Sequence, residues 1–373
     1  MVGSGLELTT LFVRESPVAP RVAPATVPTF TERLRRWLLP TPAIGVVSML
    51  LLAVLLLFGA HCLDWALVQA HWRGSSSTAC PDDGGACWAF VIARWKPWLV
   101  GNYPSDQLWR PFTCFAAFAL FWTWVVRRPN GASLLRVLQG FILLPVAFFL
   151  LLIGGGPLPV VVPTQWGGLL VTLVVTLATF ATALPLGLCL ALGRRSRWPV
   201  VRLLCGTFVE AMRAVPLLAV LFIAATLLPL FLPRDLTIGL FARAAIAFAL
   251  FNAAMAAEVF RGGLQAVDRG QIEAATTVGL SDFATLRRVV LPQALTVVVP
   301  AVVNIMIVVI KETTLLSVIG VSDLLGAIEI GAKSPDWVGE PNILTSGYVF
   351  LALAYLGVCY ALSRYSRRLE LSR

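Results

Sequence analysis

The chain has 373 residues, of which 58% are hydrophobic and 13% are charged, and its formal net charge is +10. Soluble domains carry about 25% charged residues, so this composition excludes an ordinary soluble protein. Apolar runs of about 20 residues recur, and each can cross a hydrocarbon core about 30 Å thick. The short alternating segments of a barrel are not seen. Basic residues in membrane proteins mark cytoplasmic loops, which explains the charge better than nucleic-acid binding. The sequence therefore predicts an all-α polytopic membrane protein.

Residues 1–43 are rich in Pro, Thr, Val and Ala and are expected to be irregular. The last part of this segment, TFTERLRRWLLP, has two interpretations. It either lies on the membrane surface, with Arg33, Arg35 and Arg36 towards anionic headgroups, or is a solvated tail. The first long apolar run begins near Ile44, too deep for a secretory signal peptide, so it is expected to be a retained span.

Eight apolar runs are predicted to be transmembrane helices. The longest connection, 63–110, is rich in Trp, as suits a segment at a membrane interface. Prolines inside several spans are expected to cause ordinary kinks. The predicted spans cover residues 44–62, 111–126, 137–155, 166–192, 203–232, 238–260, 294–320 and 343–362.

Two of the seven cysteines, Cys80 and Cys87, lie close together in the polar stretch STACPDDGGACWAF. A disulfide between them is plausible if this loop faces an oxidising compartment. A metal site is less favoured, because two thiolates without further ligands make only half a site. The two histidines, His61 and His71, supply no metal-binding set, and no metal is expected.

The distribution of Lys and Arg predicts the orientation. With the N-terminus inside, 20 of the 29 basic residues fall in cytoplasmic segments and 7 on the opposite side. The positive-inside rule therefore places both termini in the cytoplasm of a multi-pass inner membrane protein. The same topology places loop 63–110 outside and loop 261–293 in the cytoplasm.

Loop 261–293 contains the stretch EAATTVGLSDFATLRRVVLPQAL. Gln271–Val278 suits a short helix, and Gly279 can follow it in the left-handed conformation. Ser281 is a candidate N-cap for a second helix through Val290, and Pro292 marks the start of the next span. From the residues alone, this segment is either a contact for a partner or a surface loop that happens to be helical.

The spacing of this segment resembles the EAA loop of ABC-importer permeases, in which Val289 replaces the usual Ile. The resemblance implies that an ATPase subunit binds the first helix. The residues that carry this coupling role are Glu273, Ala274, Ala275, Gly279, Leu291 and Pro292.

The resemblance extends over residues 166–365, which are similar to the five-helix type I core of the polar amino-acid permeases. The stretches GGLLVTLVVTLATFATALPLGLCLALGRRSRWPVV, AEVFRGGLQAVDRGQIEAA and IKETTLLSVIGVSDLLG carry it. Three extra spans in 44–155 resemble, in layout, the larger permease of the general L-amino-acid importers. The chain departs from the family pattern at Arg213-Ala214-Val215-Pro216, where Gly usually follows Arg, and at Lys311-Glu312, where Asp or Ser usually follows Lys.

The charged pair Lys311 and Glu312 falls inside the seventh predicted span. An ionised residue at the centre of a span costs about 2.5–3.5 kcal/mol, so such residues usually face a polar cavity or a partner. Lys311 can meet the carboxylate of an amino acid and Glu312 its ammonium group, with Thr313 or Thr314 offering a hydroxyl. The resemblance implies a substrate site built from this segment and from the stretch at Val215 and Pro216. The alternative is that Lys311 and Glu312 pair with a partner subunit or lie near an interface.

Other polar residues in the spans are interpreted as structural. Local ion pairs are predicted between Glu210 and Arg213 and between Glu258 and Arg261, which are each three residues apart on a helix. Asn252 and Asn304 are expected to form hydrogen bonds between helices.

No phosphate-binding Gly-x4-Gly-Lys-Ser/Thr loop and no catalytic constellation occurs. We therefore expect no cofactor in this chain, with ATP and Mg bound by a separate ATPase. The expected partners are an ATPase pair, a second homologous permease forming a heterodimer, and a periplasmic amino-acid-binding protein. The function predicted is uptake of L-amino acids by alternating access. An ion-coupled secondary transporter, the alternative, would require internal repeats that are not evident, and a non-transporting scaffold would leave Lys311 and Glu312 buried without a role.

Overall fold

A computed structural model describes residues 29, 31, 38, 41–81, 84–127, 134–233 and 235–371. The chain divides into two units, Met1–Asp64 and Trp65–Arg373. Most of the predicted N-terminal segment 1–43, including Arg33, Arg35 and Arg36, lies outside the described residues. Each unit is described below by itself.

The first unit contains helix α2, Pro42–Leu63, which matches the first predicted span. Thr41 caps this helix, since its hydroxyl accepts a hydrogen bond from the backbone N–H of Ile44 at 3.3 Å. Pro42 occupies the first helical position, where its missing N–H costs nothing. The helix is apolar on all sides, as expected of a helix in contact with lipid.

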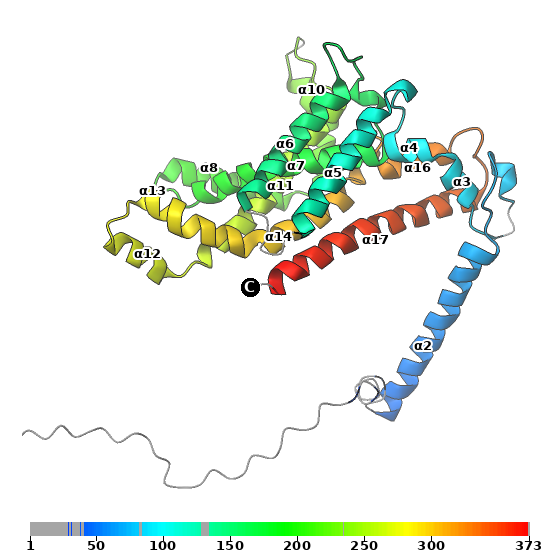
Figure 1. Cartoon of the computed structure of the whole chain (residues 1–373), viewed down its shortest axis with the longest axis horizontal. Coiled ribbons are helices and arrows are strands. Elements are labelled where there is room, and N and C mark those ends of the chain that lie inside the picture. Colours follow the sequence, from blue (N-terminus) through cyan, green and yellow to red (C-terminus); the bar gives the residue numbers. More distant parts are fainter. Residues whose placement is uncertain are drawn as a thin grey trace, which may run out of the picture. The chain divides into compact units, whose positions relative to one another are not determined.

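The second unit is built from helices joined by short turns (Figure 1). Helices α12 and α13 lie at one end of this unit, and α3, α4 and α16 lie at the opposite end; these are called the α12 end and the α16 end. The elements are α3 (Trp88–Ala93), α4 (Trp95–Val100), α5 (Trp109–Arg127), α6 (Leu134–Ile153), α7 (Gly168–Gly193), α8 (Pro199–Ala214), α9 (Leu217–Phe222), η5 (Ile223–Leu227), α10 (Leu228–Phe231), α11 (Leu240–Gln265), α12 (Arg269–Thr277), α13 (Asp282–Thr285), η6 (Leu286–Val290), α14 (Leu291–Glu312), α15 (Leu315–Val318), α16 (Leu324–Ala332) and α17 (Pro341–Leu371).

The helical membrane fold predicted from the sequence is confirmed. Within the described ranges, five helices are long and apolar enough to cross a membrane, or six if the bent pair α8 and α9–α10 is one span. The other two predicted spans correspond to α5 and α6, which have 19 and 20 residues. Each predicted span therefore has a helical counterpart.

The prediction of one continuous span over 203–232 is wrong. The helix breaks at Val215 and Pro216, and its two parts meet at 104°. Val215 takes an extended conformation, with φ −103° and ψ 135°. A proline disfavours the helical conformation of the preceding residue and lacks the N–H that would continue the hydrogen-bond ladder. Pro216 therefore causes a sharp turn, whereas only an ordinary kink was expected.

Helix α14 begins at Leu291 with Pro292 in its first turn, as predicted, but no break in the helix precedes it. The chain is helical from Asp282 to Val318 and passes Pro292 without interruption. A π-helical turn, η6, precedes the proline, and the backbone N–H of Leu291 bonds to the carbonyl of Leu286. This wider turn shifts the hydrogen-bond register just where Pro292 removes a donor. Helix α13 is therefore continuous with membrane helix α14.

Small residues bring the central helices close together. A Cβ atom added at Gly187 of α7 would lie 2.7 Å from the Cβ of Ala256 in α11. One added at Gly263 of α11 would lie 2.2 Å from a methyl group of Val298 in α14. Helices in lipid associate through such close packing, because the hydrophobic effect does not favour one apolar surface over another. Helix α11 therefore forms the centre of the bundle, in contact with both α7 and α14.

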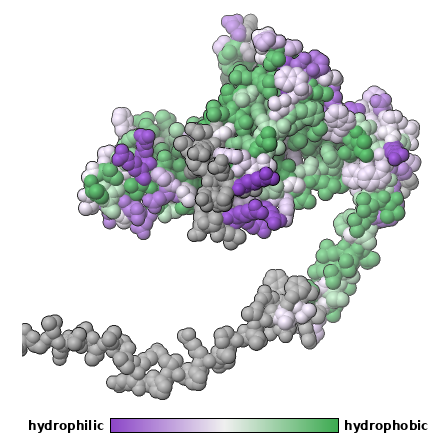
Figure 2. Space-filling model, viewed as in Figure 1, coloured by the Kyte–Doolittle hydropathy of each residue, from purple (hydrophilic) through white to green (hydrophobic). Residues whose placement is uncertain are grey.

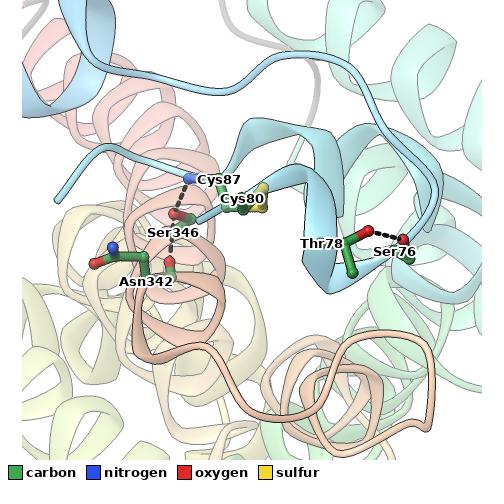
Figure 3. Close-up of a disulfide and its surroundings, with 6 residues drawn as sticks. All are labelled: Ser76, Thr78, Cys80, Cys87, Asn342 and Ser346. Carbon is green, nitrogen blue, oxygen red and sulfur yellow. Dashed lines mark hydrogen bonds between the residues drawn. A yellow bond between two sulfur atoms is a disulfide. The ribbon is translucent and has the colours of Figure 1, made fainter. Parts of the chain in front are cut away.

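At the α16 end, the structure joins Cys80 and Cys87 in a disulfide, with Cα atoms 5.6 Å apart (Figure 3). The backbone N–H of Cys87 donates to the hydroxyl of Ser346 in α17 at 2.7 Å, and that hydroxyl donates to the carbonyl of Asn342 at 2.6 Å. Phe90 packs edge-on against Trp337, with ring centroids 5.3 Å apart. The loop between α2 and α5 is therefore folded and fixed to the first turns of α17.

Replacing Cys80 and Cys87 together with Ala should loosen this loop. The disulfide closes a loop with a sequence separation of 7, and in the chain-entropy account its loss lowers the free energy of unfolding by about 2 kcal/mol. We expect limited proteolysis of residues 65–108 to become at least tenfold faster. Cys189→Ala, which removes an exposed free cysteine, is the control and should leave the rate unchanged. Equal rates for wild type and the double variant would show that the packing alone holds the loop.

The start of α16 is fixed to α7. The backbone N–H of Gly168 donates to the carbonyl of Ser322 at 3.1 Å. Asp323 caps α16 by accepting from the backbone N–H of Gly326 at 2.9 Å, and its side chain is buried. Burial raises the pKa of the Asp323 carboxyl to about 6. These contacts place the short helix α16 across the beginning of α7.

Candidate functional site

The predicted helix and left-handed glycine at the α12 end are both present. Asp268 caps α12 by accepting a hydrogen bond from the backbone N–H of Gly270 at 2.7 Å. After α12, Gly279 has φ +84°. Its N–H donates to the carbonyl of Thr276 at 2.9 Å, and the N–H of Leu280 donates to the carbonyl of Ala275 at 3.1 Å. These two bonds form a Schellman motif, which ends α12 at a defined point.

The residues predicted to contact an ATPase differ in exposure. Glu273, Ala274, Gly279 and Pro292 are exposed, and Leu291 is half-buried. Ala275 is 5% exposed, so its side chain packs within this chain and is not available to a partner. This residue positions α12 against the segment that follows it.

Two exposed apolar residues at the α12 end were not singled out by the sequence analysis. Val278 is 80% exposed and Phe283 is 70% exposed, and they lie on either side of the turn at Gly279. Figure 2 shows polar residues gathered over this end of the second unit. Large apolar side chains on such a surface are typical of a protein contact. The periodicity of α12 could not reveal Val278, because it groups this residue with the inward-facing Ile272 and Ala275.

Glu258 of α11 is the centre of an ion cluster beside the α12 end. Its side chain is 17% exposed and binds Arg261 at 2.8 Å and Arg213 at 3.3 Å. It also binds Arg194, which follows α7 and in turn binds Glu210 at 2.9 Å. The predicted pair Glu258–Arg261 is confirmed. The predicted pair Glu210–Arg213 is wrong, because Glu258 attracts Arg213 across the helix interface and Glu210 is bound by Arg194.

The loop between α7 and α8 contacts the segment at the α12 end. Arg197 binds Asp282, the first residue of α13, at 2.5 Å. Arg195 donates to the carbonyl of Leu264 in α11 at 3.3 Å. The loop between α7 and α8 is thus joined to α13 through Arg197 and to α11 through Arg195.

The candidate substrate residues lie near the end of α14. Lys311 is exposed, Glu312 is half-buried and Thr313 is buried. The Thr313 hydroxyl donates to the carbonyl of Ile310 at 2.7 Å, and that of Thr314 donates to the carbonyl of Lys311 at 2.8 Å. Both hydroxyls therefore already bond to their own helix.

Val215 and Pro216 are exposed at the break between α8 and α9. Among the described residues, no hydrogen bond or ion pair joins them to Lys311 or Glu312, as expected of apolar side chains. The helix changes direction at the same stretch where the sequence predicts substrate contacts.

Within the part of the chain that the structure describes, the interhelical hydrogen bonds predicted for two asparagines are not seen. The Asn252 amide donates to the carbonyl of Phe248 in its own helix at 3.0 Å. Asn304 is exposed on α14. Asn252 bonds to its own helix because the carbonyl four residues earlier lies within reach of its amide.

Comparisons with known proteins identify the family of this chain. Residues 183–371 match the model of the family described as binding-protein-dependent transport system inner membrane component. The chain belongs to this family. Relatives of this inner membrane component include the inner membrane amino-acid ABC transporter permease protein YhdY of Escherichia coli (strain K12), 40% identical over 83% of this chain and 83% of the relative. Another is the glutamate/glutamine/aspartate/asparagine transport system permease protein BztC of Rhodobacter capsulatus, 33% identical over 97% of this chain and 98% of the relative.

A solved structure has the same fold as the C-terminal part of this inner membrane component. It is described as the crystal structure of an amino acid ABC transporter with histidines, with a TM-score of 0.50 and 30% identity, and the match covers 55% of this chain and 92% of that one. The resemblance to ABC-importer permeases drawn from the sequence is confirmed. The chain is a multi-pass inner membrane protein of a system that works with a binding protein and an ATPase.

Proposed function

We propose that this chain is the permease subunit of an ATP-driven importer of L-amino acids. The observation that carries the proposal is the exposed helix α12, which ends at the left-handed Gly279 and packs against α13 and η6. The helix formed by α13, η6 and α14 is continuous, so a push on α12 from an ATPase can reach a membrane helix through these contacts. The amino-acid substrates named for YhdY and BztC support this choice of cargo.

In this proposal, a periplasmic binding protein delivers the amino acid and two ATPase subunits close on ATP and Mg, which this chain does not bind. Closure shifts α12, and α8–α10, α11 and α14 reorient around the substrate. Both termini are cytoplasmic, which the excess of basic residues in the segments on that side supports. Residues 166–365 form the translocating core, and 44–155 form an extension with external loop 63–110. A second, similar permease completes the pathway, as a heterodimer because of this extension.

Reconstitution tests this function. Proteoliposomes containing the assembled transporter should take up L-amino acids only with internal ATP and the binding protein. Uptake that persists in the presence of ionophores separates an ATP-driven importer from an ion-coupled carrier. Uptake that follows an ion gradient without ATP would contradict the proposal.

Lys311 and Glu312 should contribute to substrate binding, with Thr313, Val215 and Pro216 lining the same path. Lys311→Met removes the partner of the substrate carboxylate, and Glu312→Gln removes that of its ammonium group. We expect each change to raise the half-saturating concentration for uptake at least tenfold, the equivalent of about 1.4 kcal/mol. Transport of a panel of amino acids provides the measurement.

The matched control for this prediction is Lys333→Met. Lys333 is exposed at the end of α16 and also loses one positive charge in the variant. Its uptake should equal that of wild type. Unchanged uptake and selectivity in Lys311→Met and Glu312→Gln would remove both residues from the substrate site and favour a contact with a partner subunit.

A further inference from the structure

Two apolar cavities lie in line between α5 and the core helices of the second unit. The one nearer the α16 end has a volume of about 390 Å³ and reaches Trp98 and Leu324. The one nearer the α12 end has a volume of about 250 Å³ and reaches Leu295 and Tyr365. Trp122 of α5 lines both cavities, so together they form one interrupted groove.

The groove runs along most of the membrane-crossing length of the bundle. On α7 its lining extends from Leu169 to Leu188. At a rise of about 1.5 Å per residue, this stretch is roughly 28 Å long. The hydrocarbon core of a bilayer is about 30 Å thick. The groove therefore matches the depth that lipid chains occupy.

Its rim lies on the surface of the unit. Val358 of α17 and Ile142 of α6 line the groove and are exposed. Figure 2 shows hydrophobic residues gathered over α5 and α6, the helices on this side. In a membrane protein, this surface is in contact with acyl chains, which can enter from the side.

The lining contains no charged side chain. Thr172 and Thr176 line the groove, and their buried hydroxyls have no hydrogen-bond partner among the described residues. Water in the groove would therefore find few hydrogen-bond partners. A groove left empty would lose the dispersion contacts of its walls. An acyl chain needs no hydrogen-bond partner and makes dispersion contacts with the walls of the groove.

Basic residues surround the α12 end of the groove. Arg127 ends α5 two residues after Val125, which lines the groove. Arg368 lies three residues after Tyr365, on the same face of α17, and Arg364 is next to Tyr365. All three arginines are exposed. Guanidinium groups bind phosphate oxygens in bidentate geometry, and basic pockets at helix ends bind anionic headgroups.

We propose that this groove binds an acyl chain of an anionic glycerophospholipid, whose phosphate is held by Arg127 and Arg368. The acyl chain then occupies the groove from the α12 end past Trp122 to Ala119, and the lipid belongs to the leaflet at the α12 end. A zwitterionic lipid has the same acyl chains but no net negative charge to match the two arginines, so the site selects lipids by their headgroup.

Native mass spectrometry of the purified full chain tests this assignment. The probes are phosphatidylglycerol and phosphatidylethanolamine, added together in equal amounts in detergent. We expect one phosphatidylglycerol retained per chain, with at least fivefold preference over phosphatidylethanolamine. Arg127→Gln/Arg368→Gln should reduce phosphatidylglycerol retention at least fivefold. Arg202→Gln/Arg287→Gln removes two exposed positive charges elsewhere and should retain the lipid.

A second pair of variants tests the apolar part of the site. Ala119 is exposed at the rim and lines the groove, so Ala119→Trp fills it from outside and should displace the lipid. Leu120→Trp adds the same ring to an exposed neighbour outside the lining and should not. Equal retention in all variants, or no preference between the two lipids, would overturn the proposal.

Discussion

Gly279→Asp should abolish co-purification of the ATPase subunit while leaving the permease folded. A side chain added at Gly279 meets nothing within 4 Å in this chain, so the space around it is free until a partner occupies it. Burying a carboxylate in that interface without a partner costs several kcal/mol. We expect at least a tenfold loss of retained ATPase on affinity purification, and a similar loss of uptake.

The control for this variant is Gly279→Asn. Asparagine has the size of aspartate, carries no charge and tolerates the left-handed conformation that φ +84° imposes. It should retain more ATPase than Gly279→Asp. Both variants should keep the thermal unfolding midpoint of wild type within a few degrees. Full co-purification and uptake in Gly279→Asp would show that no ATPase binds at this turn. The proposed coupling role of α12 would then be wrong.

The sequence was most informative where local physics determines the structure. Alternating apolar runs and polar loops predicted the spans, because lipid requires helices whose backbone groups are paired internally. The Gly279 and Ser281 signals predicted the end of α12 and the start of α13, since capping depends on a few neighbouring residues. Gly279 was also the position from which a partner contact could be inferred.

The sequence was less informative where tertiary contacts compete. Arg213 is three residues from Glu210 and was paired with it, but Glu258 on another helix binds it instead. Ala275 belongs to the EAA spacing, yet it packs inside the chain. Pro216 and Pro292 are the same residue type, yet the helix breaks sharply at Pro216 and continues through Pro292. A π turn, η6, precedes Pro292, whereas Val215 before Pro216 is extended, and no single-residue signal reveals this difference.

Glu258→Gln should destabilise the α12 end and reduce transport. Glu258 neutralises three arginines from three elements, and Arg213 lies only two residues before the break at Val215. Removing its charge leaves those guanidinium groups close together with one fewer acceptor. For a fully buried cluster this costs 3–5 kcal/mol, but partial exposure of the arginines screens it, so we expect about 2 kcal/mol. The thermal midpoint in detergent and the initial rate of uptake should both fall.

Glu210→Gln is the matched control, because Glu210 binds Arg194 alone and is 62% exposed. Exposed ion pairs contribute about 0–1 kcal/mol, so this variant should unfold close to wild type. The double variant Glu258→Gln/Arg213→Gln should be less destabilised than the sum of its single variants, since the second change removes a repelling charge. Equal effects of Glu258→Gln and Glu210→Gln would mean that the cluster is an ordinary surface network. Alternatively, Glu258→Gln alone would reduce uptake, and by more than it reduces stability. That result would mean that the ion cluster beside α12 controls the angle between α8 and α9.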